Sequence, residues 1–177
     1  MSDVTIRAAA PADVAAITRI YAEAVKHGTA TFEIEPPDEA EMARRLQTLV
    51  AGNYPYLVAE RSGALAGYAY AGPYHLRPAY RSTVEDSVYL DLQFQGQGIG
   101  RLLMRQLLAD AEARSFRQMI ALVGDSTNTA SIALHAAAGF LPVGTLRSVG
   151  YKHGRWLDVV VMQRPLGSAD SSPPLPP

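Results

Sequence analysis

Three glycines alternate with other residues near the middle of this chain of 177 residues: Gly96, Gly98 and Gly100. Residues 83–92, which precede them, have the pattern of a strand, and apolar residues at helical spacing follow over 98–114. Glycine lets the backbone turn sharply and approach a ligand with no side chain in the way. The first N–H groups of a helix that begins there are unpaired and attract anions, phosphates above all. We therefore predict a phosphate-bearing ligand at this turn.

Two common nucleotide-binding motifs do not fit this turn. A Walker loop requires Lys and then Ser or Thr after its last glycine, whereas Arg101 and Leu102 stand there. The dinucleotide fingerprint G-x-G-x-x-G requires glycine at 101 or 103, and these positions are Arg101 and Leu103. A turn with only a structural role is the alternative, but three alternating glycines at a strand-to-helix junction favour a ligand site.

A second motif follows after one more predicted strand, with the pattern Asn128-x-x-Ser131-x-x-Leu134-His135-x-x-x-Gly139-Phe140. Preceded by Gln95-x-x-Gly98-x-Gly100, it resembles the second part of the acetyl-CoA site in the Gcn5-related N-acetyltransferase (GNAT) superfamily. The resemblance implies that acetyl-CoA is the co-substrate. The residues that we expect to contact it are Val88, Tyr89, Leu90, Gln95, Gly96, Gln97, Gly98, Ile99, Gly100, Arg101, Asn128 and Ser131.

A closer resemblance covers residues 3–166. Thr31-Phe32, Ala79-Tyr80, Thr83-x-Glu85-x-Ser87-Val88-Tyr89 and the closing Gly150-x-Lys152-x-Gly154-x-Trp156-x-Asp158 are similar to the phosphinothricin and methionine sulfoximine acetyltransferases. This subfamily implies direct attack of a small amino-acid-like substrate's α-amino group on the thioester. It also implies a homodimer with the substrate site near the subunit interface.

Amide formation from a thioester requires that the amine lose a proton, that the carbonyl be polarised and that the thiolate be stabilised. Glu85 lies on the strand that leads to the glycine turn, and the resemblance places the family's catalytic glutamate on it. A carboxylate is a weak base, so we expect Glu85 to act through water or by positioning the ammonium group. Asp86 is the alternative acid, and a solvated glutamate without a catalytic role is the structural alternative.

His135 is the second catalytic candidate. Many GNAT relatives have a tyrosine at this position as the acid that protonates the thiolate, whereas phosphinothricin-type relatives share the histidine. Histidine can donate a proton near neutral pH, and a packed or capping histidine is the alternative. We expect a backbone N–H near Val88–Leu90 to polarise the acetyl carbonyl. Asn128 is expected to act as a helix N-cap, to bond the pantetheine amide, or to do both.

The substrate site is expected in the loop before the predicted base. Arg77 and then Arg81 are the candidates to clamp a carboxylate or phosphinate, because a guanidinium binds such groups bidentately. Phe32 is expected to form a wall of the substrate pocket. Lys152 and Trp156 are interpreted as hairpin residues, the commoner role of such residues in strands.

The predicted elements follow the order β-α-α-β-β-β-α-β-α-β-β, which indicates an α+β or mixed α/β fold around one sheet. The resemblance implies a central, twisted, mostly antiparallel sheet flanked by helices. One domain over 1–166 is expected, followed by a disordered Ser/Pro-rich tail over 167–177. The expected strands are 4–8, 56–60, 65–71, 83–92, 119–123, 143–151 and 156–163, and the expected helices are 11–27, 36–50, 98–114 and 128–138.

The bulk composition excludes several kinds of function. The formal net charge of −1, without a basic run, argues against nucleic acid or an anionic membrane as partner. The absence of cysteine excludes a thiolate nucleophile and a disulfide framework. The four histidines lack metal-ligand spacing, so no metal is expected. Charges near the start, such as Asp3 and Arg7, leave no room for a signal-peptide core, and a cytoplasmic protein is expected.

Two other functions remain as alternatives at this point. An acetyltransferase of protein N-termini or lysines would need an open peptide groove, and the loops around Phe32 and Arg77 argue against one. A non-catalytic acyl-CoA-binding or regulatory domain would not need Glu85 and His135.

Overall fold

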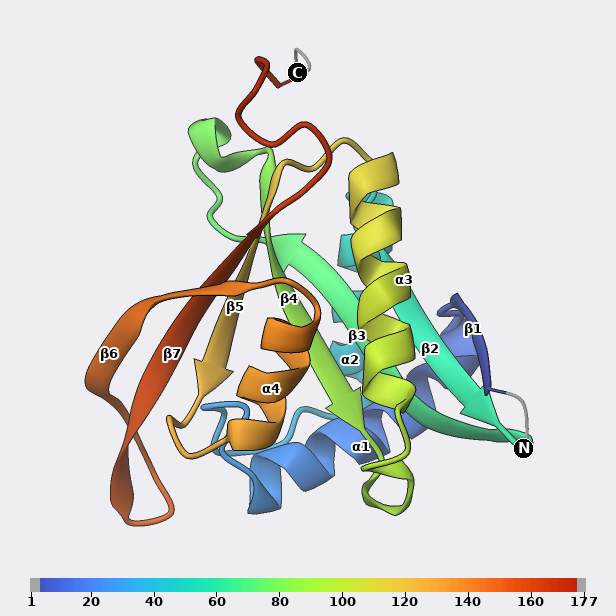
Figure 1. Cartoon of the computed structure of the whole chain (residues 1–177). Helices are drawn as coiled ribbons and strands as arrows, with labels where there is room; N and C mark the ends of the chain where they lie inside the picture. The colour runs from blue at the N-terminus through green and yellow to red at the C-terminus, as the bar shows by residue number, and fades with distance from the viewer. Residues whose placement is uncertain (1–3, 175–177) are drawn as a thin grey trace.

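The computed structural model describes residues 4–174, which form one seven-stranded sheet and four α-helices (Figure 1). The order of elements predicted from the sequence is confirmed, with ends shifted by a few residues. The helices are α1 (Val14–His27), α2 (Glu39–Ala51), α3 (Ile99–Ala113) and α4 (Thr129–Ala137). The strands are β1 (Val4–Ala8), β2 (Tyr56–Arg61), β3 (Ala64–Pro73), β4 (Thr83–Leu90), β5 (Gln118–Gly124), β6 (Leu141–Lys152) and β7 (Arg155–Pro165).

The strands are arranged in the order β1-β2-β3-β4-β5-β7-β6, and all neighbours are antiparallel except β4 and β5. These two parallel strands pair only from Thr83–Gln118 to Glu85–Ile120. Beyond that point they spread apart, as Figure 1 shows for β4 (green) and β5 (gold). The predicted mixed α/β fold with a mostly antiparallel sheet is confirmed, and the sheet is split at its centre.

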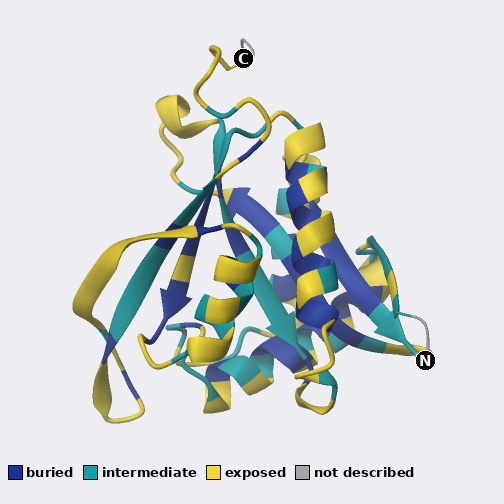
Figure 2. Cartoon of the chain, viewed as in Figure 1, coloured by how far each residue is buried: buried dark blue, intermediate teal, exposed yellow. Residues whose placement is uncertain are grey.

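Strand side chains alternate between the two faces of the sheet, and each face has its own core. On β3, Tyr68 and Tyr70 pack on the side of α1 and α2, whereas Ala69 and Ala71 pack on the side of α3. Figure 1 shows α3 and α4 in front of the sheet and α1 and α2 behind it. In the same view, Figure 2 shows buried residues along the central strands and a mostly exposed β6 at the left.

Helix α3 presents one apolar stripe to the sheet, as its sequence spacing predicts. Ile99, Leu103, Leu107 and Ala111 are in helical register, and each has 0% exposed surface. Truncation of such a leucine to alanine costs about 2–5 kcal/mol of folding free energy. This packing fixes the start of α3, and therefore the glycine turn, against the sheet.

Strand β4 ends two residues earlier than predicted. The Asp91 carboxylate accepts a hydrogen bond from the Gln93 N–H at 3.1 Å and pairs with Arg19 at 2.5 Å. An aspartate that bonds the backbone two residues ahead favours a turn over a continued strand. The chain therefore makes a short 3₁₀ turn over Leu92–Phe94 before it reaches the glycines.

The segment after β7 contacts the domain through Arg117. Its guanidinium donates to the Ser168 hydroxyl and to the backbone carbonyls of Ala169 and Pro173, the last two at 3.0 and 3.1 Å. The domain boundary at residue 166 and the disorder of the tail remain predictions. Within residues 4–174, the helices are too short or too polar to cross a lipid bilayer.

Candidate active site

The split between β4 and β5 forms the centre of the candidate site. Because side chains alternate along β4, Glu85, Ser87 and Tyr89 face α1 and α2, whereas Asp86 and Val88 face α3 and α4. A cavity of about 350 Å³ lies at the split and is lined by residues of both faces. Two ligands can therefore approach from opposite faces of the sheet and meet where the strands separate.

Glu85 is the last residue of β4 that pairs with β5, and its side chain lines this cavity. Partial burial, reinforced by the charge of Asp86, raises the pKa of Glu85 to about 7. Near neutral pH the carboxyl group is therefore divided between its two protonation states. A general base is most effective when its pKa lies near the working pH, so this environment suits proton abstraction from an amine.

Asp86 and His135 form a buried pair on the other face of the split. His135 Nδ1 lies 2.7 Å from the Ser131 carbonyl oxygen, which can only accept, so Nδ1 carries a hydrogen. His135 Nε2 lies 2.9 Å from Asp86 Oδ2, and a hydrogen bond there requires a second proton. Burial lowers the pKa of His135, but the hydrogen bond and charge of Asp86 and the Ser131 carbonyl outweigh it, and the pKa is raised.

This pair is a proton-holding group in the wall of the cavity. Both ring nitrogens of His135 are engaged, so its Nε2 proton points at Asp86 rather than at open space. Asp86 Oδ1 is buried and has no hydrogen-bond partner among the described residues, and both side chains line the cavity. A proton transferred from this pair to a ligand in the cavity would therefore pass next to the Asp86 carboxylate.

The glycine turn has the backbone that the sequence predicts for an anion site. Gly96 and Gly98 have φ values of 70° and 81°, which side-chain-bearing residues rarely adopt. Gly98 is the N-cap of α3 and offers no side chain to its first turn, which leaves first-turn N–H groups for an anion. The turn opens onto a cavity of about 580 Å³ between α3 and α4, which also includes Gly100 and Arg101.

The cavity at the turn adjoins the cavity at the split. Both are lined by Val88, Asn128 and Ser131. Asn128 caps α4, because its Oδ1 accepts the Ser131 N–H at 3.2 Å. This is the N-cap role, the first of the two roles expected for Asn128. Its amide nitrogen is not part of that bond, so the cap and a donated bond to a ligand are compatible. An extended ligand with a phosphate at the glycine turn can reach Glu85.

The structure places the other predicted cofactor residues in different roles. Tyr89, Leu90 and Gln95 line the cavities around the turn and the split. The Ile99 side chain is in the core. The Gln97 side chain accepts a bond from Arg61 and donates to the Gln93 carbonyl at 2.8 Å, so it braces the turn.

The predicted substrate residues are divided. Phe32 lines the cavity at the split. Arg77 and Arg81 are exposed on the loop between β3 and β4, and neither belongs to the lining of that cavity. Within the described chain, this lining contains no lysine or arginine. A lysine or arginine that pairs with an acceptor carboxylate in the cavity would therefore have to reach it from a residue outside this lining.

Several lining residues were not predicted as site residues from the sequence, among them Ser87, Tyr21 and Tyr70. Ser87 could have been found, because it lies two residues from Glu85 and so shares its face of the strand. Tyr21 on α1 and Tyr70 on β3 carry no local signal, since the packing of α1 on the sheet brings Tyr21 to the split and pairing with Ser87 on β4 brings Tyr70 there.

The split sheet, the glycine turn and the Glu85 cavity together define an acetyltransferase of the GNAT class. The family model described as "Acetyltransferase (GNAT) domain" matches residues 6–161, and the chain belongs to this family. The family and the N-acetyltransferase activity expected from the two motifs are confirmed. Within residues 4–174, no group of three or more His, Cys, Asp or Glu residues could hold a metal ion.

Individual relatives share nearly the whole chain. It is 54% identical over 170 residues to the phosphinothricin N-acetyltransferase of Alcaligenes faecalis, covering 96% of this chain and 86% of that protein. It is 40% identical to the L-methionine sulfoximine/L-methionine sulfone acetyltransferase of Salmonella typhimurium, covering 90% and 92%. The crystal structure of a phosphinothricin acetyltransferase from Sinorhizobium meliloti, in complex with AcCoA, matches with a TM-score of 0.95 and 48% identity over 99% and 94% of the two chains.

Proposed function

We propose that the chain transfers the acetyl group of acetyl-CoA to the α-amino group of a small amino-acid-like substrate such as phosphinothricin or methionine sulfoximine. The observation that carries this proposal is the pair of adjoining cavities, one at the glycine turn and one at Glu85, that share lining residues at the split sheet. The substrates named for the Alcaligenes and Salmonella relatives support the choice of acceptor. Acetylation would neutralise the amine, and we propose a resistance role in the cytoplasm.

The donor site is formed by the α3 and α4 face. The glycines and the first turn of α3 would hold the diphosphate, and the Asn128 amide nitrogen would bond the pantetheine arm. Bound acetyl-CoA supplies the thioester. Strand β4 has no strand partner on the β5 side beyond Glu85, so its backbone can bond the arm and polarise a carbonyl.

The acceptor site is formed by the α1 and α2 face. Glu85 takes the proton of the incoming ammonium group, directly or through one water, because its raised pKa matches neutral pH. The Asp86–His135 pair lies on the donor side and holds the proton that neutralises the departing thiolate. Glu85 and the Asp86–His135 pair thus lie on opposite faces of the split. One face is suited to take a proton from the amine, and the other is suited to give a proton to the thiolate.

The acceptor's acidic group needs a cation that the cavity wall does not provide. We propose that Arg77, and secondarily Arg81, supplies it from the β3–β4 loop. The guanidinium would bind a carboxylate or phosphinate through two parallel hydrogen bonds.

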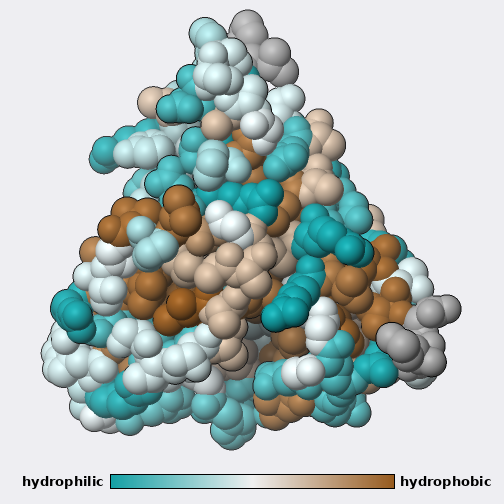
Figure 3. All heavy atoms as spheres, in the orientation of Figure 1, coloured by the Kyte–Doolittle hydropathy of each residue, from teal (hydrophilic) through white to brown (hydrophobic). Residues whose placement is uncertain are grey.

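We also propose that the chain forms a homodimer through the β6–β7 hairpin. Strand β6 is an edge of the sheet, and unprotected edges readily pair with another chain. Figure 3 shows apolar residues gathered over this hairpin, at the left of the view. A second copy would cover the large apolar side chains exposed there, which are Leu141, Val143, Leu146, Val149, Tyr151 and Trp156.

Sedimentation tests the dimer. Leu146→Asp on β6 should convert a dimer into a monomer, because a charge would be buried in the interface. Val50→Asp on α2 is the matched control, since Leu146 and Val50 are both 52% exposed. A wild-type monomer at micromolar concentration, or equal behaviour of the two variants, would refute this interface.

The activity is tested by thiol release from acetyl-CoA with a panel of amines. Phosphinothricin and methionine sulfoximine should be acetylated faster than plain amino acids, polyamines, aminoglycosides and peptides. Preference for peptides would favour the protein-acetyltransferase alternative. Acetyl-CoA binding without any thiol release across the panel would favour a regulatory acyl-CoA-binding domain.

A further inference from the structure

The ring of Phe32 lies on two glycines that belong to distant strands. A Cβ added at Gly150 on β6 would overlap the ring at Cε2 and Cδ2 and lie 3.0 Å from Cζ. A Cβ added at Gly124, at the end of β5, would overlap the Thr29 carbonyl oxygen and lie 3.2 Å from ring atom Cε1. Neither glycine has a positive φ, so an unusual backbone does not explain them: the Phe32 ring requires the missing side chain at Gly150, and the ring and the loop backbone together require it at Gly124. Gly124 and Gly150 therefore form a seat for Phe32.

The backbone beside Phe32 is held from the hairpin. The buried Lys152 ammonium donates to the Thr31 carbonyl oxygen at 2.8 Å, and burial lowers the pKa of this lysine. The His153 ring lies 3.2 Å from the Gly28 carbonyl oxygen at the start of the same loop. The loop before α2 is thus tied to β6 and to the turn after it.

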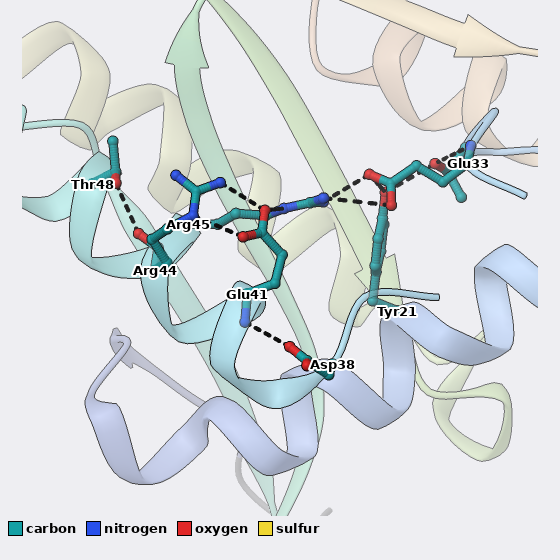
Figure 4. Close-up of polar contacts among 8 residues, drawn as sticks. Tyr21, Glu33, Asp38, Glu41, Arg44, Arg45 and Thr48 are labelled. Carbon is teal, nitrogen blue, oxygen red and sulfur yellow. Dashed lines mark hydrogen bonds and ion pairs between the residues drawn. The ribbon is translucent and has the colours of Figure 1, made fainter. Parts of the chain in front are cut away.

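The same loop is held from the helices on its other side. The Tyr21 hydroxyl lies 2.9 Å from the Thr31 hydroxyl and 3.0 Å from Glu33. Glu33 also accepts from Arg45 on α2 at 2.7 Å, and Arg45 is itself paired with Glu41 at 2.8 Å. Figure 4 shows this chain of contacts running from α2 through Arg45 and Glu33 to Tyr21. With bonds on both sides, the loop cannot shift easily to relieve pressure on the Phe32 ring.

The cavity at the split is open space next to Phe32. Gly124 and Gly150 bound the ring, and the loop backbone is fixed, while Phe32 lines the cavity shared with Glu85. Protein interiors are close-packed, so an added methyl group at the seat must displace neighbouring atoms. We expect a methyl at position 150 to push the ring into this cavity.

We propose that the seat formed by Gly124 and Gly150 determines the acceptor size that the enzyme accepts, by fixing the depth of the Phe32 ring in the cavity. Lys152 is a positioning residue, because it holds the loop from which the ring projects. This inference rests on the proposed function, since it assigns the acceptor to the Phe32 side of the split. It also gives the closing hairpin motif a role at the site, although Lys152 is interpreted from the sequence as hairpin structure only.

A double-mutant cycle tests the seat. Gly150→Ala should raise KM for phosphinothricin and methionine sulfoximine about 10-fold, as displacement of a packed ring into the site predicts, with acetyl-CoA affinity unchanged. The same substitution in a Phe32→Ala background should have no further effect, because the displaced ring is gone. Phe32→Ala alone should admit acceptors with bulkier side chains. Gly144→Ala is the control, since Gly144 is also on β6 and a Cβ there meets no atom within 4 Å.

Thermal unfolding of the same variants provides a readout that does not depend on turnover. Gly150→Ala should lower the midpoint, and the loss should disappear when Phe32 is alanine. Equal losses in both backgrounds, or a Gly150→Ala enzyme with wild-type KM for every acceptor, overturn the seat. If the Gly150→Ala variant does not fold, the double variant with Phe32→Ala should still fold, because the displaced ring is absent. A double variant that also fails to fold would overturn the proposal. A wild-type enzyme that acetylates neither analogue overturns the proposed acceptor instead.

Discussion

Replacement of Glu85 by glutamine should remove one ionisation from the pH profile of the enzyme. With a pKa of about 7, the Glu85 carboxylate fraction is about 10% at pH 6, about half at pH 7 and about 90% at pH 8. If the carboxylate is the base, kcat/KM of the wild type for the acceptor should rise about tenfold across this range from Glu85 alone, because kcat/KM reports the ionisation of the enzyme before the acceptor binds. The Glu85→Gln enzyme should lose this rise and about 10²-fold in kcat at neutral pH, the usual contribution of a positioned base.

The assay is initial-rate thiol release at saturating acetyl-CoA between pH 5.5 and 9. Any rise caused by the substrate's own amine persists in the variant, so the difference between the two profiles isolates Glu85. Glu35→Gln, in an exposed loop position, controls for the loss of one carboxylate. Calorimetric affinity for acetyl-CoA should not change, because the donor side of the split is formed by other residues. Near-normal kcat with an intact break at pH 7 would remove Glu85 from the mechanism.

Three further outcomes follow from the site. Asp86→Asn should lower the pKa of His135 and cost about 1–3 kcal/mol of unfolding free energy at pH 6. Because the pKa of His135 is raised in the folded protein, the stability contributed by the Asp86–His135 pair is complete below the pKa of an unfolded histidine and is lost as pH rises through the folded pKa. In urea unfolding, the difference in unfolding free energy between wild type and Asp86→Asn should therefore be smaller at pH 9 than at pH 6. A difference that does not change with pH would contradict the shared proton. Gly98→Val and Gly100→Val should abolish acetyl-CoA binding, measured by calorimetry on folded protein. Valine does not tolerate the φ of 81° at position 98, and at position 100 it adds bulk beside the donor cavity. Wild-type affinity in either variant would disprove the phosphate site. Arg77→Ala should raise the acceptor KM far more than the acetyl-CoA Kd, with partial rescue by lysine, and an unchanged KM for all acceptors would exclude this clamp.

Local patterns were enough to predict the scaffold of the site. The stripe of α3 and the alternating glycines act over a few residues, and the structure has the expected helix directly after the glycines, with a φ of 81° at Gly98. The apolar runs of the strands fixed the order of elements in the same way. The end of β4 was misplaced because the Asp91 side chain competes with strand pairing, which an apolar pattern does not register.

The walls of the cavity depend on contacts between distant parts of the chain. Asp86 and His135 are 49 residues apart in the chain, and nothing in either segment indicates that they share a proton. Arg77 is expected near the reactants because it precedes Glu85 closely in sequence. The loop that carries Arg77 enters β4 at Thr83, two residues before Glu85, but Arg77 does not line the cavity at the split. Its contact with the acceptor therefore stays a prediction, because the reach of a loop side chain depends on the loop conformation and not on its distance along the chain.

The separation of β4 from β5 also has a kinetic consequence. In the proposed arrangement, donor and acceptor enter by different faces, so neither needs to leave before the other can bind. The chain also has no cysteine to carry an acyl-enzyme. Initial-velocity plots should then give intersecting lines, the pattern of a ternary complex, rather than the parallel lines of a ping-pong mechanism. The same arrangement would give the acetylated product and free CoA separate exits after transfer. Slow departure of the large nucleotide product therefore need not trap the small one, and each release step can be altered by substitutions on its own side of the sheet.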